Sequence, residues 1–310
     1  MKRKVIIDCD VGVDDALALI LAFHSPELEV KAVTGVSGNV PVERVFENIQ
    51  KVLSLLKPQA LPLIAKGASQ PLKGHPVYAY SVHGKSGLGD AIIELRKEEI
   101  WWQYFSGSAE ELIAKLARQH PDEITLVATG PLTNVALGVQ RDPEAMRRLK
   151  EVVSMGGAVR TRGNITPYAE FNIYSDPLAA RIVFESGLPV TLVPLDVTHQ
   201  VFLTSELLEK RVNPINNAFS KFAIDAIGYD LRAHQFRRRE VMCLHDPLAA
   251  GAVVAPGLVK KERLCLQVET DEGGHFGHIT EVEEGPGIDV CLGVDAKGFL
   301  ELFLSRLKQL

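Results

Sequence analysis

The sequence of 310 residues predicts an α/β protein with a single doubly wound, mainly parallel β-sheet and helices on both of its faces. Short apolar runs typical of strands alternate with segments of helical periodicity. These runs are almost continuously apolar, as in strands that are covered on both faces. Several of them end in polar or glycine-rich segments, which would meet at the edge of a parallel sheet where ligands bind.

The predicted elements follow one another along the chain. Strands are expected at residues 4–8, 29–34, 61–65, 123–128, 151–154 and 190–193. Helices are expected between them at residues 14–24, 42–56, 109–120, 132–140 and 176–186. This order implies right-handed βαβ crossovers. Residues 258–294 indicate extra strands and residues 296–308 a closing helix, and no linker divides the chain, so residues 1–310 are predicted to form one domain.

Two segments have the character of lids. Residues 66–107 form a long stretch without a regular pattern, and loops of this length in a compact domain are often functional. This stretch carries His83 in a glycine-containing run that lacks the spacing of a phosphate-binding loop. Residues 213–240 are helical in pattern and carry Tyr229, His234 and Arg237. Contacts with a ligand are expected from both segments.

Composition excludes several partners. The net charge of −5 gives no indication of a nucleic-acid partner, and the basic run at 237–239 is typical of a solvated helix end. No apolar stretch approaches the roughly 20 residues of a membrane span, and the apolar run after the N-terminal basic residues is too short for a signal peptide. The four cysteines show no paired spacing, which indicates reduced thiols and a cytoplasmic protein.

The most informative segment is an acidic turn between the first strand and the first helix. It contains Asp8, Asp10, Asp14 and Asp15 within eight residues. Like charges this close resist ionising together, and a helix N-terminus or a cap accounts for one or two acids. A hard divalent cation such as calcium or magnesium accounts for the set. Asp8 and Asp10 are expected to point the same way, and Gly12 to let the turn fold so that Asp15 approaches Asp10.

Further polar residues fall at predicted strand or helix ends. His245 and Asp246 precede Pro247 and an apolar helical run; alone they indicate an ordinary helix start, but beside the acidic turn they suggest a proton donor and a further metal ligand. Glu170 and Asn172 suit a polyol ligand. Asn39 is a turn residue by default and a hydroxyl ligand if the strand ends converge. No sequence of the GxSxG type is present, and burial beside acids would raise the pKa of the Cys9 thiol, so nucleophilic serine or cysteine catalysis is not expected.

These motifs together resemble the inosine-uridine preferring nucleoside hydrolase family. The family begins with DxDPGxDD, which this chain matches as DCDVGVDDA with Val11 in place of proline. The resemblance continues in order along nearly the whole chain through VTGVSGN (33–39), VATGPLTN (127–134), SMGGAV (154–159), AEFN (169–172), DP (176–177), PLDVTH (194–199) and HDPLA (245–249).

The resemblance implies calcium-dependent hydrolysis of ribonucleosides to ribose and free base, on a modified doubly wound fold in homodimers or homotetramers. It implies that Ca²⁺ is held by Asp10, Asp15, Asp246 and the backbone carbonyl of Thr129. It implies that ribose is bound by Asp14, Asn39, Glu170 and Asn172, with the Met155 backbone nearby. By the same comparison Asp10 is the general base, His245 protonates or polarises the leaving base, and His83 is a lid residue near that base.

Two other functions fit parts of the sequence. A phosphatase of the haloacid dehalogenase type would use Asp8 as a nucleophile with magnesium, but this leaves the second acid pair and the HDP motif unexplained. A non-catalytic nucleoside- or calcium-binding protein could share the fold, since a fold does not establish activity. The preferred base, purine or pyrimidine, is left open by the sequence, because it depends on residues in the lid segments.

Overall fold

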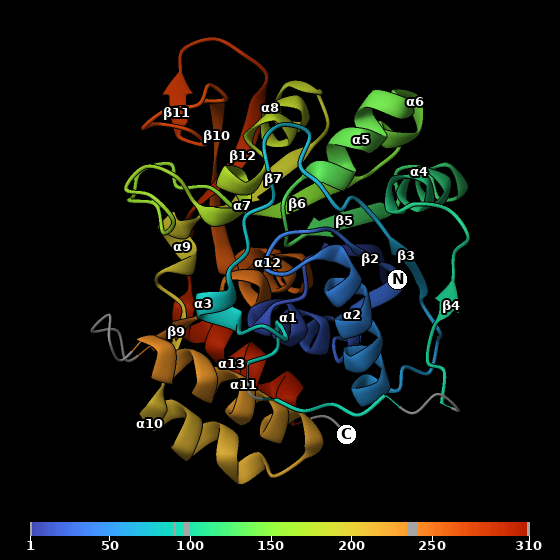
Figure 1. Cartoon of the computed structure of the whole chain (residues 1–310), viewed down its shortest axis with the longest axis vertical. Helices are drawn as coiled ribbons and strands as arrows, with labels where there is room; N and C mark the ends of the chain where they lie inside the picture. The colour runs from blue at the N-terminus through green and yellow to red at the C-terminus, as the bar shows by residue number, and fades with distance from the viewer. Residues whose placement is uncertain (1, 90, 96–98, 235–240, 309–310) are drawn as a thin grey trace.

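Ten strands of the described chain form one central sheet (Figure 1). The computed structural model describes residues 2–89, 91–95, 99–234 and 241–308, except for the side chains of residues 230–234. In spatial order the strands are β11 (Ile279–Val282), β10 (Val259–Val268), β12 (Gly287–Val294), β7 (Val190–Val193), β6 (Glu151–Met155), β5 (Ile124–Ala128), β1 (Arg3–Cys9), β2 (Leu28–Gly35), β3 (Leu63–Lys66) and β4 (Gln103–Tyr104).

The sheet is parallel except around β10, which pairs antiparallel with both β11 and β12. From β1 the chain winds outward through β2 and β3 to β4, and it then returns to β5 on the other side of β1 and winds outward through β6 and β7. The winding direction therefore reverses between β1 and β5. In open α/β sheets, ligands bind beyond the carboxyl ends of the strands at such a reversal.

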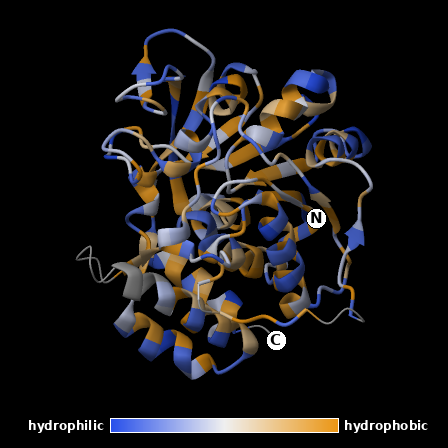
Figure 2. Cartoon of the chain, viewed as in Figure 1, coloured by the Kyte–Doolittle hydropathy of each residue, from blue (hydrophilic) through white to orange (hydrophobic). Residues whose placement is uncertain are grey.

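Helices cover both faces of the sheet. Side chains of β1 alternate between two hydrophobic clusters, with Val5 and Ile7 in one and Ile6 in the other. The first cluster includes residues of α1 (Val13–Phe23), α2 (Val42–Leu56), α12 (His245–Val254) and α13 (Ala296–Leu307), and the second those of α4 (Ala109–Gln119), α5 (Thr133–Arg141) and α8 (Pro177–Glu185). Figure 2 shows hydrophobic residues along the central strands and mixed colours on the peripheral helices.

The predicted fold class is confirmed, with small differences in bounds. All six predicted strands are present as β1, β2, β3, β5, β6 and β7, and the five predicted helices as α1, α2, α4, α5 and α8. The C-terminal segment contains the expected extra strands, β10 to β12, followed by α13. The sequence did not indicate β4 or the separate two-stranded antiparallel sheet of β8 (Phe202–Thr204) and β9 (Val241–Cys243), because strands of two or three residues show no periodicity.

Several further elements are short. They are α6 (Pro143–Met146), α7 (Phe171–Ser175), α9 (Leu195–Thr198), α10 (Ser205–Leu207), the π-helix η1 (Leu208–Val212) and the 3₁₀ segment η4 (Pro256–Leu258). In the described ranges no helix has the length and apolar character needed to cross a bilayer.

The two segments predicted as lids touch each other. The first contains α3 (Tyr80–His83) and β4, and the second contains η2 (Asn213–Ile215) and α11 (Ala218–His234). Gly84 and Gly89 lie directly against Tyr229 of α11: a Cβ at Gly84 would be 3.2 Å from Tyr229 Cζ, and one at Gly89 would be 2.8 Å from Tyr229 Cβ. The side chain of His234 and all of Arg237 lie outside the described residues.

Candidate active site

The acidic turn lies at the point where the sheet reverses its winding. Asp10 follows β1 directly, and α1 begins three residues later with Asp14 and Asp15 in its first turn. The backbone N–H of Gly12 donates to Asp15 Oδ2 over 2.8 Å, so this carboxylate also caps the helix that carries it. Val13 to Ala22 of α1 are all buried, which means that the positive end of a fully enclosed helix faces the acids.

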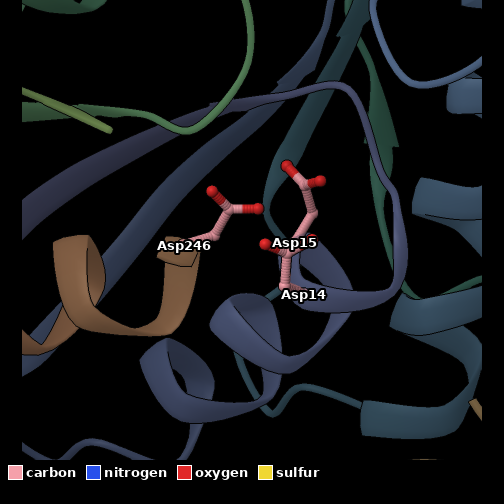
Figure 3. Close-up of side chains that lie close together, drawn as sticks. All are labelled: Asp14, Asp15 and Asp246. Atoms are coloured by element: carbon pink, nitrogen blue, oxygen red, sulfur yellow. The ribbon is translucent and has the colours of Figure 1, made fainter. Parts of the chain in front are cut away.

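A second buried helix brings a further acid to the same place. Helix α12 has Asp246 in its first turn and, like α1, is buried along its length from this residue onward. One carboxylate oxygen from each of Asp14, Asp15 and Asp246 lies within 4.8 Å of the others (Figure 3). Residues more than 200 positions apart in the sequence therefore form one cluster of oxygen ligands.

Asp10 is enclosed beside this cluster. Its Oδ2 accepts a hydrogen bond of 2.6 Å from the backbone N–H of Asn39, whereas its Oδ1 is buried without a hydrogen-bond partner among the described residues. Two glycines leave it just enough room: a Cβ at Gly38 would lie 2.1 Å from Asp10 Oδ2, and one at Gly130 would lie 3.0 Å from Asp10 Cγ. The carboxylate is thus fixed in place with one oxygen still able to bind a ligand.

The electrostatics of the cluster favour a cation. Burial, followed by the charge of Asp15, raises the pKa of Asp10 well above its usual value. Burial and then the charges of Asp14 and Asp15 do the same to the pKa of Asp246. Several enclosed carboxylates together with the orphan oxygen of Asp10 form the all-oxygen donor set that a hard divalent cation prefers, so the residues present fit calcium.

Thr129 connects this cluster with the polar residues on the other side of the reversal. Its hydroxyl donates to Asp15 Oδ1 over 2.7 Å, and its backbone N–H donates to the Asp8 carbonyl over 2.8 Å. Its own carbonyl accepts from Asn172 Nδ2 over 2.7 Å. A carbonyl oxygen has two lone pairs, so this contact leaves Thr129 able to bind a cation as well.

Asp8 has different hydrogen-bond partners from Asp10. Its Oδ1 accepts from Thr34 Oγ1 over 2.6 Å and from Asn134 Nδ2 over 2.8 Å. Burial raises the pKa of Asp8 to about 7. Asp8 lies within β1, whereas Asp10 follows the last residue of this strand, Cys9.

Glu170 and Asn172 lie at the start of α7. Glu170 caps this helix and accepts from the backbone N–H groups of Asn172 at 2.9 Å, Ile173 at 3.2 Å and Gly157 at 2.9 Å. Burial raises the pKa of Glu170 above its usual value, although the hydrogen bonds from the backbone lower it in part. Asn172 Nδ2 also donates to the Met155 carbonyl over 3.2 Å. The carboxylate and the amide are therefore held rigidly at the ends of β5 and β6.

Most of the predicted site residues line a cavity of about 440 Å³ at these strand ends, here called the strand-end cavity. A cavity of this size is in the range of small-molecule sites. Asp10 and Asp15 are fully buried and lie outside its lining. The predicted residues that line it are Asp14, Asn39, His83, Thr129, Met155, Glu170, Asn172, His245 and Asp246.

Both predicted histidines are held by hydrogen bonds. His83 Nδ1 accepts from the backbone N–H of Val13 over 3.1 Å, and His245 Nδ1 lies 2.7 Å from Thr198 Oγ1. The sequence predicted that Gly12 lets the turn fold, but the structure gives another reason for a glycine at this position. A Cβ at Gly12 would lie 2.8 Å from His83 Nδ1, so a side chain there would collide with the histidine ring. The φ of Gly12, −88°, is accessible to any residue. The position therefore requires the absence of a side chain and not a backbone conformation special to glycine.

Other lining residues were not predicted as site residues. Asn164 lines the cavity, and its Oδ1 accepts from the Phe171 backbone N–H over 2.9 Å. His199 faces His245 with 5.8 Å between the ring centroids. Their signals were present in the sequence, since Asn164 ends the glycine-rich loop and His199 ends the PLDVTH motif. Tyr78 and residues 241–243 of β9 carry no such local signal, and Tyr229 does not line the cavity.

Comparison with known proteins agrees with this geometry. The sequence model of the "inosine-uridine preferring nucleoside hydrolase" family matches residues 5–301. The pyrimidine-specific ribonucleoside hydrolase RihA of Salmonella gallinarum is 39% identical over 316 residues, which cover 99% of each chain.

Solved structures give the same result. A plant nucleoside hydrolase, PpNRh1, superposes with a TM-score of 0.93 at 31% identity and 100% coverage of both chains. A purine-preferring ribonucleoside hydrolase from Gardnerella vaginalis superposes with a TM-score of 0.91 at 32% identity, covering 99% of this chain and 98% of that one. Neither the phosphatase nor the non-catalytic alternative is favoured by these matches. The chain therefore belongs to the inosine-uridine preferring nucleoside hydrolase family, whose members are glycosidases acting on N-glycosyl compounds.

Proposed function

We propose that this protein hydrolyses the N-glycosidic bond of ribonucleosides to ribose and free base, and that it depends on calcium. The observation that carries the proposal is the enclosed cluster of Asp14, Asp15 and Asp246 beside Asp10, at the edge of a cavity large enough for a nucleoside. The cavity also presents amide, carboxylate and imidazole groups, which suit a sugar on one side and a base on the other.

Calcium would be held by Asp10, Asp15, Asp246 and the Thr129 carbonyl, and when bound it would supply positive charge that orients and acidifies water and binds ribose hydroxyls. The orphan Oδ1 of Asp10 and the carbonyl of Thr129 support this set. The close approach of Asp14 to the same point supports a role for Asp14 at the boundary between cation and ribose.

In the proposed reaction, a water oxygen forms a bond to C1′ of the ribose while the bond from C1′ to the base nitrogen breaks. The electron pair of the broken bond stays with the base. Asp10 accepts one proton from the water, and His245 gives one proton to the base, so ribose and neutral base leave.

Ribose would be bound by Asp14, Asn39, Glu170 and Asn172, with the Met155 backbone nearby. Burial and the backbone hydrogen bonds of Glu170 and Asn172 support this role, because pre-oriented polar groups bind hydroxyls with little loss of side-chain entropy. The negative charge of the acids around the sugar would stabilise the positive charge that develops at C1′. His83 would contact the base from the segment that precedes Gly84.

The test is ribose release, measured with a reducing-sugar assay, from inosine, uridine, adenosine and cytidine with and without a calcium chelator. Release that the chelator abolishes and added calcium restores would support the proposal and would also rank the bases. Ribose release that continues after exhaustive chelation would contradict the proposed dependence on calcium. Failure to release ribose from any of the four by calcium-loaded, folded protein would contradict the proposed substrate class.

Two further features belong to the proposal. We expect a homodimer or homotetramer, which light scattering in solution would measure directly. We also expect a cytoplasmic location, which the free state of Cys9, Cys243, Cys265 and Cys291 supports.

A further inference from the structure

The hydroxyl of Thr198 is a hydrogen-bond partner of the His245 ring. Thr198 Oγ1 and His245 Nδ1 are 2.7 Å apart, which is a short distance for a hydrogen bond between a hydroxyl and an imidazole. Thr198 is fully buried at the end of α9, whereas His245 is only partly buried and lines the strand-end cavity. Because Thr198 is enclosed by the protein, its hydrogen bond can set the orientation of the His245 ring in the cavity.

The backbone around Thr198 is well fixed. The Thr198 N–H donates to the Pro194 carbonyl over 3.1 Å, and α9 follows β7 directly, so the central sheet positions it. The segment before His245 is tied to the same place, because the Leu244 N–H donates to the Val201 carbonyl over 2.9 Å. Both ends of the contact between Thr198 and His245 are therefore attached to the same rigid structure.

We propose that Thr198 is a positioning residue for the leaving base: its hydroxyl fixes His245 through Nδ1, so that His245 meets the base through Nε2. This rests on the proposed function, in which His245 protonates the base. A threonine hydroxyl can donate to Nδ1 of the neutral ring, which then carries its proton on Nε2, and it can accept from Nδ1–H of the charged ring. In the charged ring, Nε2 carries the proton that is transferred to the base, and the transfer leaves a neutral ring whose Nδ1–H donates to Thr198 Oγ1. In the neutral ring with its proton on Nε2, this N–H polarises the base through a hydrogen bond.

The alternative is that the hydrogen bond only satisfies a buried hydroxyl. In that case removal of the hydroxyl would weaken the protein and lower its activity on all substrates alike. A role in leaving-group protonation gives a different result, because a substrate whose leaving group is stable as an anion does not need the proton. The two roles are therefore distinguishable by the choice of leaving group.

The experiment compares the full-length wild type with Thr198→Val, which keeps the shape without the hydroxyl, and Thr198→Ser, which restores it. Each is assayed with calcium on the most reactive natural nucleoside and on p-nitrophenyl β-D-ribofuranoside. For Thr198→Val we expect kcat on the nucleoside to fall about 10- to 100-fold with little change in KM, a part of the usual contribution of a general acid. On the nitrophenyl substrate we expect a change of less than about threefold, and Thr198→Ser should recover most of the loss.

A second readout does not depend on turnover. The ¹⁵N NMR signals of the His245 ring, identified by their loss in His245→Asn, should shift in Thr198→Val and return in Thr198→Ser. Unchanged ring signals, or equal loss of activity on both substrates, would overturn the inference. If the wild type cleaves neither substrate, the proposed function fails, and the NMR comparison still decides whether Thr198 orients His245.

Discussion

Two glycines determine the position of the Asp10 carboxylate, and Gly38 approaches it most closely. We expect Gly38→Ala to displace Asp10, because the new Cβ would lie 2.1 Å from Asp10 Oδ2, far inside a normal contact. Overpacking of this kind typically costs about 1–3 kcal/mol of stability. Calcium affinity, measured by isothermal titration calorimetry, and kcat/KM should both fall by about tenfold or more.

Gly257→Ala is the matched control, since a Cβ at Gly257 would meet nothing within 4 Å. This variant should bind calcium and release ribose as the wild type does. Wild-type calcium affinity in Gly38→Ala would show that Asp10 is not a ligand, or that the turn adapts without cost.

The proposed position of the ribose next to Asp14 and the calcium ligand Asp246 predicts that the enzyme is selective for ribonucleosides. Asp14 and Asp246 are both buried, with exposed fractions of 7% and 3%, and a 2′-deoxyribose would remove a hydroxyl that can pair with them. Sites built to hydrogen-bond a hydroxyl reject the analogue that lacks it strongly. We expect kcat/KM for 2′-deoxyuridine or 2′-deoxyinosine to be lower by about 10³-fold or more than for the matching ribonucleoside. Equal rates would contradict this assignment of ribose contacts.

At the residue scale, the sequence could indicate the acids but not the whole lining. Four carboxylates within eight residues favour a cation, so the sequence alone indicated Asp10, Asp14 and Asp15 as candidate site residues. Tyr78 and Cys243 line the cavity only because distant segments fold over the strand ends. No local pattern encodes such an approach.

At the element scale, the cluster depends on two buried helices, α1 and α12, whose N-termini meet. We expect Asp246→Asn to leave the calcium-free protein at least as stable as the wild type, because it removes charge repulsion from Asp14, Asp15 and Asp10. The same change should weaken calcium binding by at least about tenfold, since ligand charge tunes affinity. In thermal unfolding, saturating calcium should raise the Tm of the wild type by several degrees and that of the variant by less.

Asp271→Asn removes an equal charge from an exposed position in the turn between β10 and β11, so it serves as the control. Its response to calcium should equal that of the wild type. A full calcium response in Asp246→Asn would show that α12 does not contribute to the cation site.

The sequence predicted the long, buried helices and strands better than the short ones. The six parallel strands that the sequence predicted are four to eight residues long and mostly apolar, and helices such as α2 and α4 carry clear caps or periodicity. In contrast, α7 has only five residues and begins because Glu170 caps it, and β8 and β9 are stable only as a pair. Such elements depend on tertiary contacts and leave little trace in the local sequence.

At the scale of the whole molecule, the buried acids should make stability depend on pH in an unusual direction. The pKa of Asp8 is about 7 in the fold, raised mainly by burial from its ordinary value of 3.8. Between these values the folded state holds more protons than the unfolded state, so stability is lost as pH rises from about 4 to about 7. The full shift corresponds to on the order of 4 kcal/mol, and Asp10 and Asp246 act in the same direction.

Urea unfolding of the chelator-treated protein between pH 5 and pH 8 measures this dependence. Asp8→Asn should reduce the slope, because the amide is neutral at every pH and keeps an oxygen to accept from Thr34 and Asn134. A slope that is unchanged in Asp8→Asn would show that Asp8 is ionised throughout this range.

We further propose that residues 1–310 form one domain. The central sheet takes its strands from residues 3 to 294, which supports cooperative unfolding of the chain as a unit. Circular dichroism and the fluorescence of Trp101 and Trp102 should therefore report coincident transitions in urea. Two separate transitions would indicate more than one domain.

The contact of Tyr229 with Gly84 and Gly89 has a consequence for engineering. Residues that precede this glycine pair, such as Tyr78 and His83, line the cavity, but the loop that follows them is shaped to fit a side chain of α11. A chimera that takes only residues 78–89 from a relative with another base preference would place a foreign loop against Tyr229. Transfer of the base preference of a relative should therefore require that the loop and α11 are exchanged together.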